Sequence, residues 1–280
     1  MSESAKIREL LRVHGKPTRE VYYDLENSGW VPREVLEAMI LYFNERGYGH
    51  PSITHKPGWE ALEALLEARE FIASSINASP DEIFFTHSGT EVNNLAIIGS
   101  TIGGKKGKVI ISAIEHFSVL LPANSLEQLG FKVVQVPVDE EGIVDLDILE
   151  ILIDKDTVLV SIQLVNHEIG SIQPLREISR IVKEINPQTL IHTDAADAYC
   201  RIPINVEDLG VDMLTLSNHK ILASKGAGAL YVRNGVKVEK IIHGALSTQT
   251  LWLGVENVPS IVGFHKAAEL VYRDFNKQVT

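Results

Sequence analysis

The sequence predicts an α/β fold with three layers, in which a mainly parallel β-sheet lies between two layers of helices. Two observations support this class. First, seven short apolar runs follow one another from residue 82 onward, at residues 82–86, 108–112, 132–138, 157–164, 189–193, 213–217 and 228–232. Second, helical patterns separate most of these runs, and the apolar side chains of residues 175–185 recur at helical spacing. Nearly continuous apolar strands that alternate with amphipathic helices are typical of a parallel sheet covered on both faces.

Helical patterns also precede the predicted sheet. Residues 4–14 form a short pattern, and residues 31–47 carry Pro32 where a helix should begin and Gly47 where it should end. In residues 59–76 we expect one apolar face that packs on the rest of the protein. The side chains expected on that face are Trp59, Leu62, Leu65, Leu66, Ile72 and Ile76.

The composition limits the partners that this chain is expected to have. A net charge of −11 argues against a nucleic-acid backbone or an anionic membrane surface as the main partner. No apolar stretch approaches the roughly 20 residues that span a bilayer, and the N-terminus lacks the apolar core of a secretion signal. Cys200 is the only cysteine, so no intramolecular disulfide can form and a reducing compartment is expected. We therefore expect a cytoplasmic protein.

Polar side chains follow the predicted strands at the points where the strands end. The carboxyl ends of parallel strands meet at one edge of a sheet, where such folds bind their ligands. The residues expected at this edge are Ser88, Gly89, Thr90, Glu115, His116, Asn166, His167, Asp194, Asp197, Ser217, His219 and Lys220. Among them, Gly89 and Thr90 open a helix, whose free N–H groups and dipole favour either a phosphate group or a simple side-chain cap.

Several common kinds of site do not match the sequence. The glycine-rich fingerprint of dinucleotide-binding folds is absent, because "GGKKGK" precedes a strand instead of following one. The segment "HEIGS" lacks the second histidine of a zinc protease. Asp194 and Asp197 have no cluster of histidines or cysteines at ligand spacing, so no metal site is predicted. Cys200 lies in an apolar stretch, which favours a buried structural thiol over a nucleophile.

The groups that remain match the needs of pyridoxal phosphate. A lysine amine forms an imine with the aldehyde of this cofactor, and an acidic side chain holds its ring nitrogen protonated. An aromatic side chain stacks on the ring, and amides at a helix start hold the phosphate. Lys220, at the junction of residues 213–217 and 228–232, is the candidate for the amine.

The same residues resemble the cysteine desulfurases of the class V aminotransferase group, which are fold type I pyridoxal phosphate enzymes. The resemblance runs from about residue 20 to the C-terminus, through "YGHPSITH", "EIFFTHSGTEVNNLAI", "EHFSV", "VNHEIGSIQPL", "HTDAADA", "SNHKI", "KGAGALYVR" and "VENVPSIVGF". It implies that Lys220 forms the imine, Asp194 partners the pyridine nitrogen and His116 stacks on the ring. The implied phosphate ligands are Gly89, Thr90, Ser217 and His219.

The sequence departs from the family pattern near the cofactor. His167 replaces the second asparagine of "VNNEIG", which lies near the phenolic oxygen, and leaves Asn166 beside it. Asp197 replaces a glutamine, and an acid there should change the protonation of the imine. The loop of residues 243–257 lacks both family arginines, and Val255 replaces a threonine that reaches the phosphate of the neighbouring subunit.

The resemblance also implies a domain organisation. Residues 1–20 are expected to form an N-terminal helix or arm, and residues 21–262 a cofactor-binding large domain like that of fold type I pyridoxal phosphate-dependent transferases. Residues 263–280 are expected to begin a helix that leads toward the family's small domain. In the family, that domain and its mobile loop carry the persulfide-forming cysteine and the arginine that binds the substrate carboxylate. We therefore expect little desulfuration by residues 1–280 alone.

The implied function is the mobilisation of sulfur from L-cysteine, with a homodimer as the expected assembly and a sulfur-acceptor or scaffold protein as a further partner. The alternative is a non-catalytic subunit or half-enzyme that keeps the fold and works with a partner in sulfur transfer or iron–sulfur assembly. The Lys220 and Asp194 pair favours the first reading, because a scaffold needs neither residue. A third alternative, a generic nucleotide-binding domain, applies only if the protein binds no pyridoxal phosphate.

Overall fold

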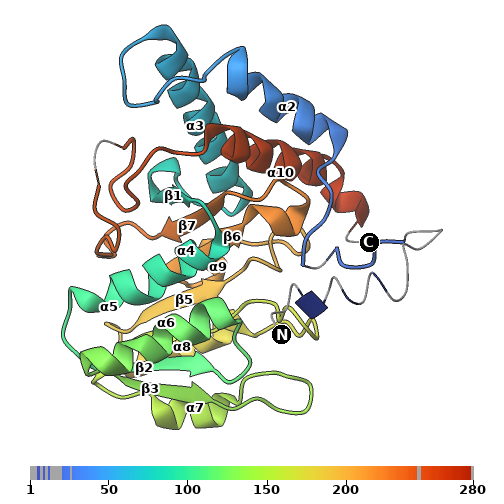
Figure 1. Ribbon diagram of the computed structural model, residues 1–280. Coiled ribbons are helices and arrows are strands. Elements are labelled where there is room, and N and C mark those ends of the chain that lie inside the picture. The colour runs from blue at the N-terminus through green and yellow to red at the C-terminus, as the bar shows by residue number, and fades with distance from the viewer. Residues whose placement is uncertain are drawn as a thin grey trace.

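The protein is built on one seven-stranded sheet (Figure 1). The structure is a computed structural model that describes residues 5, 6, 9, 12, 21–25, 27–244 and 247–278. The predicted arm of residues 1–20 otherwise lies outside the described residues. The strands, in chain order, are β1 (Ile83–Thr86), β2 (Lys108–Ser112), β3 (Lys132–Val136), β4 (Thr157–Ser161), β5 (Leu190–Asp194), β6 (Met213–Ser217) and β7 (Gly228–Val232). Six of the strands lie within one of the seven predicted runs, and β5 extends one residue beyond its run of residues 189–193, to Asp194.

The strand order is β1-β7-β6-β5-β4-β2-β3. The strands from β3 to β6 pair in parallel, whereas β7 runs antiparallel to both β6 and β1. The chain therefore reverses direction between β6 and β7, and Lys220 lies in that reversal, in the short 3-10 helix η4 (Asn218–Ile221). The prediction of a mainly parallel sheet is confirmed.

Helices cover both faces of the sheet (Figure 1). The helices on one side of the sheet share a single hydrophobic core with it, and α2 packs on α10 in this layer. They are α2 (Arg33–Asn44), α3 (Lys56–Ser75), α7 (Leu146–Leu152), α8 (Leu175–Ile185), α9 (Val206–Leu209) and α10 (Val258–Gln278). The opposite face packs against a helical stretch made of α4 (Gly89–Asn94), the π-helix η2 (Leu95–Gly99) and α5 (Ser100–Ile102), and against α6 (Phe117–Ser125) with the 3-10 helix η3 (Leu126–Leu129). Because side chains alternate along a strand, Ile110 packs in the first core while Val109 and Ile111 pack in the second.

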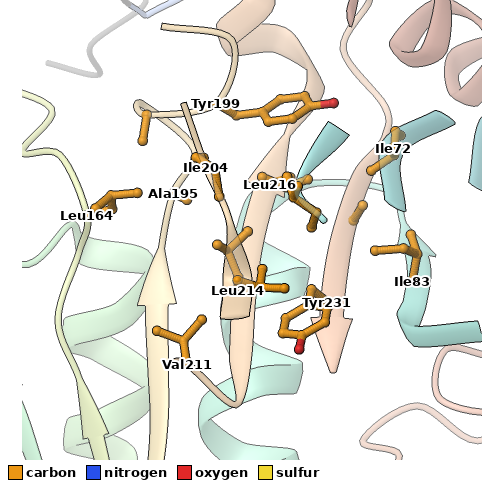
Figure 2. Close-up of a cluster of buried hydrophobic side chains, with 14 of the residues drawn as sticks. Ile72, Ile83, Leu164, Ala195, Tyr199, Ile204, Val211, Leu214, Leu216 and Tyr231 are labelled. Carbon is orange, nitrogen blue, oxygen red and sulfur yellow. The ribbon is translucent and has the colours of Figure 1, made fainter. Parts of the chain in front are cut away.

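The centre of the first core joins β1, β6 and β7 to α3. Figure 2 shows Leu214 and Leu216 of β6 beside Tyr231 of β7 and Ile83 of β1, with Ile72 of α3 next to them. All five side chains are buried. This core fixes the positions of β6 and β7, between which Lys220 lies.

The buried face of α3 differs from the expected one. Trp59 is 60% exposed and Leu66 44% exposed, whereas the core side of the helix carries Ala61, Ala64, Leu65, Ala68 and Ile72. The small alanine side chains let α3 approach its neighbours closely. The burial of Leu65, Ile72 and Ile76 is confirmed. The prediction was wrong for Trp59 and Leu66, because it considered the large apolar side chains and not the alanines.

Helix α10 packs on α2 and α3. It begins at Val258, so the predicted domain boundary at residue 262 falls inside one continuous helix. The division into a large domain and a helix leading away from it stays a prediction. None of the helices in the described ranges is long and apolar enough to cross a membrane.

Residues 247–257, the described segment before α10, lie against the open edge of β1. The Gln249 side chain accepts a hydrogen bond from the Phe85 N–H at 2.8 Å and donates one to the Phe85 carbonyl at 2.6 Å. The buried Trp252 ring lies 4.3 Å from the His87 ring, centroid to centroid. Trp252 therefore packs within its own chain.

A close approach between β7 and α4 places the start of that helix. A Cβ atom added to Gly228 would lie 2.8 Å from the backbone carbon and 2.9 Å from the backbone oxygen of Ser88, the residue that caps α4. Only glycine permits this contact, because backbone atoms cannot turn aside as a side chain can.

We predict that Gly228→Ala lowers the free energy of unfolding by about 1–3 kcal/mol, the usual cost of overpacking a tight contact. Urea denaturation followed by circular dichroism measures the change. Gly104→Ala is the matched control, because its added Cβ would meet nothing closer than 3.8 Å, and its effect should stay within about 0.5 kcal/mol. Equal stabilities of the two variants would contradict the close approach.

Candidate active site

The loops that follow β1, β2, β4, β5 and β6 line one open cavity. Nine of the ten site residues predicted from the sequence line it: Gly89, Thr90, His116, His167, Asp194, Asp197, Ser217, His219 and Lys220. The cavity is also lined by five residues that were not predicted from the sequence: Asn93, Ser118, Gln163, Val165 and Ala196. The parallel strands therefore bring the polar side chains together at their carboxyl ends.

Lys220 reaches the cavity from η4 and pairs with an acid. Its side chain is 11% exposed, and its Nζ lies 3.3 Å from Oδ1 of Asp197, whose side chain is also 11% exposed. Arg201 holds both residues, because it donates to Asp197 Oδ1 at 2.8 Å and to the Lys220 backbone carbonyl at 3.2 Å. The amine of Lys220 is thus held at a defined place at the wall of the cavity.

Asp194 ends β5 and presents a buried carboxylate. Its Oδ1 accepts from the Ala196 N–H at 2.9 Å, and its Oδ2 accepts from Asn93 Nδ2 at 2.7 Å. Burial raises the pKa of Asp194 above its ordinary value, against the opposing effect of these two hydrogen bonds. A carboxylate held in this way favours a positively charged or N–H-bearing group beside it.

His116 forms the cap of α6 and lies beside a second histidine. Its Nδ1 accepts from the Ser118 N–H at 3.1 Å. The rings of His116 and His167 are 4.9 Å apart and almost perpendicular, at 83°. Burial lowers the pKa of His116, although the charge of Asp194 opposes this change. A neutral imidazole therefore faces the cavity.

The start of α4 lies against the end of β6. A Cβ added to Gly89 would be 3.0 Å from both Cβ and Oγ of Ser217, and Ser217 Oγ lies 3.0 Å from Nδ1 of His219. Ser88 caps the helix by accepting from the Glu91 N–H at 3.2 Å. The first N–H groups of the helix and two polar side chains thus meet at one point, an arrangement that suits an anionic group.

Asn166 is the one predicted site residue that does not line the cavity. Its Oδ1 accepts from the N–H groups of Glu168 and Ile169, each at 2.9 Å, and its Nδ2 donates to the Ile114 carbonyl at 3.1 Å. The side chain therefore shapes the loop after β4. Gln163, at the end of the same strand region, lines the cavity instead.

Cys200 lies away from the cavity lining and is buried. Burial raises the pKa of its thiol far above the ordinary range, so it does not form the reactive thiolate at neutral pH. This agrees with the structural role expected from the sequence.

Asn93 and Ser118 had only weak signals in the sequence. Asn93 lies one helical turn after Gly89 and so shares a face with the start of α4, and Ser118 follows the capping His116 by two residues. Polar residues at such positions are usually solvated, and only the packing of the helices on the sheet turns these two inward. Both are buried in the structure.

The sequence and the fold match known proteins over most of the chain. The aminotransferase class-V family matches residues 21–278. A cysteine desulfurase IscS of Dictyoglomus turgidum is 45% identical over 263 residues, which cover 93% of this chain and 66% of the relative. A solved structure titled "NIFS-LIKE PROTEIN" has a TM-score of 0.89 and 40% identity over 92% of this chain and 71% of its own. For a second structure, titled "SspA in complex with cysteine", the TM-score is 0.85 and the identity 37%, over 89% and 72% of the two chains.

The chain spans about two thirds of the length of the curated relatives that it matches. Within that span the family match begins before α2 and continues through α10, so it includes the whole sheet and every residue that lines the cavity. The chain belongs to the aminotransferase class-V family.

Proposed function

We propose that this chain binds pyridoxal 5'-phosphate and forms the cofactor-binding part of a cysteine desulfurase that acts on L-cysteine. The observation that carries the proposal is the meeting of the Lys220 amine and the Asp194 carboxylate on one cavity, from the ends of neighbouring strands. The names of its relatives support the reaction, because the Dictyoglomus protein is a cysteine desulfurase and the SspA structure is titled as a complex with cysteine.

The cavity has the polar groups that this cofactor needs. Two buried polar atoms of cavity-lining residues, Asn93 Oδ1 and His167 Nδ1, have no hydrogen-bond partner among the described residues. Buried polar groups are normally paired, so such atoms point to a group that completes the site. Gly89 and Thr90, the first two residues of α4, line the cavity beside Ser217, and a helix start of this kind suits an anion.

Each residue then has a defined part in the proposal. Lys220 would hold the aldehyde carbon, Asp194 would partner the ring nitrogen, and His116 would provide an aromatic contact for the ring. Gly89, Thr90, Ser217 and His219 would hold the phosphate. When bound, pyridoxal phosphate supplies an electron sink for the amino acid. His167 and Asp197 face the same cavity, and Asn166 supports the loop that carries His167.

Release of sulfur from cysteine also requires a thiolate that attacks the substrate sulfur. Cys200 does not fit this role, because it is buried and its pKa is raised. The proposal therefore assigns the sulfur-accepting thiolate to a cysteine other than Cys200, with a sulfur-acceptor or scaffold protein as the partner downstream. A chain that binds the cofactor without any exchange with amino acids would favour the non-catalytic alternative.

The proposal includes a homodimer and a reducing, cytoplasmic setting. The homodimer rests on the family resemblance alone, and Trp252 of the loop before α10 packs against His87 of the same chain. Val255 of that loop is 59% exposed and remains open to a second subunit. The reducing setting agrees with a single, buried cysteine thiol.

We predict that borohydride reduction, after incubation with pyridoxal phosphate, attaches the cofactor to Lys220. Peptide mass spectrometry should find the added mass on the peptide that contains this residue, because its amine is held at the cavity wall. Lys220→Ala should lose the label, whereas Lys225→Ala, which removes an exposed lysine of the same loop, should keep it. Attachment to another lysine in the wild-type protein would overturn the assignment.

We also predict that Cys200 of the folded protein reacts with iodoacetamide at least tenfold more slowly than Cys200 of the urea-unfolded protein, because burial suppresses the thiolate. The pKa is raised in the fold, so the difference should persist as the pH rises above the ordinary pKa of a thiol, about 8.5. Equal rates in the two states would show that Cys200 is accessible and would restore it as a sulfur carrier.

A further inference from the structure

An unbroken row of hydrogen bonds joins Asp194 to His116 through two residues that the proposed chemistry does not use. Asn93 Nδ2 lies 2.7 Å from Asp194 Oδ2 and 2.7 Å from Ser118 Oγ. Ser118 Oγ in turn lies 2.7 Å from Nδ1 of His116. Asn93 is 1%, Ser118 7% and Asp194 8% exposed. Water therefore competes little with these bonds.

Chemistry fixes the direction of every hydrogen bond in this row. An ionised Asp194 can only accept, so the amide of Asn93 must turn its NH2 group toward it. The second hydrogen of that NH2 group goes to Ser118 Oγ. The hydroxyl hydrogen of Ser118 is then left for His116 Nδ1.

A backbone group independently indicates that His116 Nδ1 accepts hydrogen bonds. The Ser118 N–H also points at His116 Nδ1, at 3.1 Å. A proton on Nδ1 would face this N–H group, so Nδ1 must act as an acceptor. Burial already lowers the pKa of His116, which favours a neutral ring.

We propose that Ser118 and Asn93 are positioning residues that hold His116 as the neutral tautomer protonated on Nε2. His116 lines the cavity, and none of the described residues hydrogen-bonds to its Nε2. His116 therefore offers the cavity an N–H donor and not an acceptor. This inference rests on the proposed function only for the identity of the ligand that would accept a hydrogen bond from Nε2–H.

The form of His116 is also tied to Asp194. The NH2 group of Asn93 faces Ser118 only because the carboxylate holds the amide in that orientation. The charge of Asp194 thus influences the tautomer of His116 through the side chains of Asn93 and Ser118. A ligand that keeps Asp194 ionised would also keep His116 in the donor form.

Nitrogen NMR of the cofactor-free protein labelled with ¹⁵N-histidine tests the proposal, and the His116→Gln spectrum identifies the signals of His116. In the wild-type protein at neutral pH, Nε2 should have the shift of a protonated nitrogen and Nδ1 that of an unprotonated one. A wild-type His116 that carries its proton on Nδ1, or on both nitrogens, would overturn the proposal without any variant.

Ser118→Ala removes the hydroxyl donor and should raise the share of the Nδ1–H tautomer about fivefold, which corresponds to one ordinary hydrogen bond of about 1 kcal/mol. Ser118→Thr keeps a hydroxyl and should restore the wild-type spectrum. An unchanged His116 spectrum in Ser118→Ala would show that the hydroxyl has no such role. Because these measurements need no cofactor, their result is separate from whether pyridoxal phosphate binds.

Discussion

The site depends on a carboxylate that the fold holds out of water. Asp194 stands at the end of β5, nine-tenths buried, with two hydrogen bonds from Asn93 and Ala196. Burial without a full positive partner disfavours its ionised form, as the raised pKa shows. A cationic ring nitrogen beside it would remove this penalty. Binding of such a ligand would therefore offset the desolvation free energy of the buried Asp194 carboxylate.

The rest of the architecture brings an amine and an anion site to the same carboxylate. The register of β5 and β6 pairs Asp194 with Thr215, and β6 ends at Ser217, three residues before Lys220. The reversal into β7 then requires Gly228, whose missing side chain lets α4 begin directly above the sheet. Two glycines, Gly89 and Gly228, thus place the helix start beside Ser217. Packing of β6 and β7 in the core holds these distances.

The sequence predicts the strands well because their apolar runs are long enough to be unambiguous and because a parallel sheet gathers its strand ends. Asp194, Lys220 and His116 could be found from that rule alone. Asn93 and Ser118 could not, because only the rotation of α4 and α6 over the sheet decides which side of a helix is buried. Asn166 was also placed at the site by the strand-end rule, yet its amide closes the loop after β4. Loop hydrogen bonds of this kind leave no periodic trace in a sequence.

The most direct measurement is the affinity for pyridoxal phosphate of the wild-type protein and of Asp194→Asn, by absorption titration, with Cys200→Ser as the control. Asparagine keeps the size of the side chain and removes its charge. If Asp194 holds a protonated ring nitrogen, the variant should bind at least tenfold more weakly, the loss expected for one charge-assisted hydrogen bond of about 1.5–3 kcal/mol. Cys200→Ser should bind as the wild type does. Equal affinity of Asp194→Asn and the wild type would contradict the account.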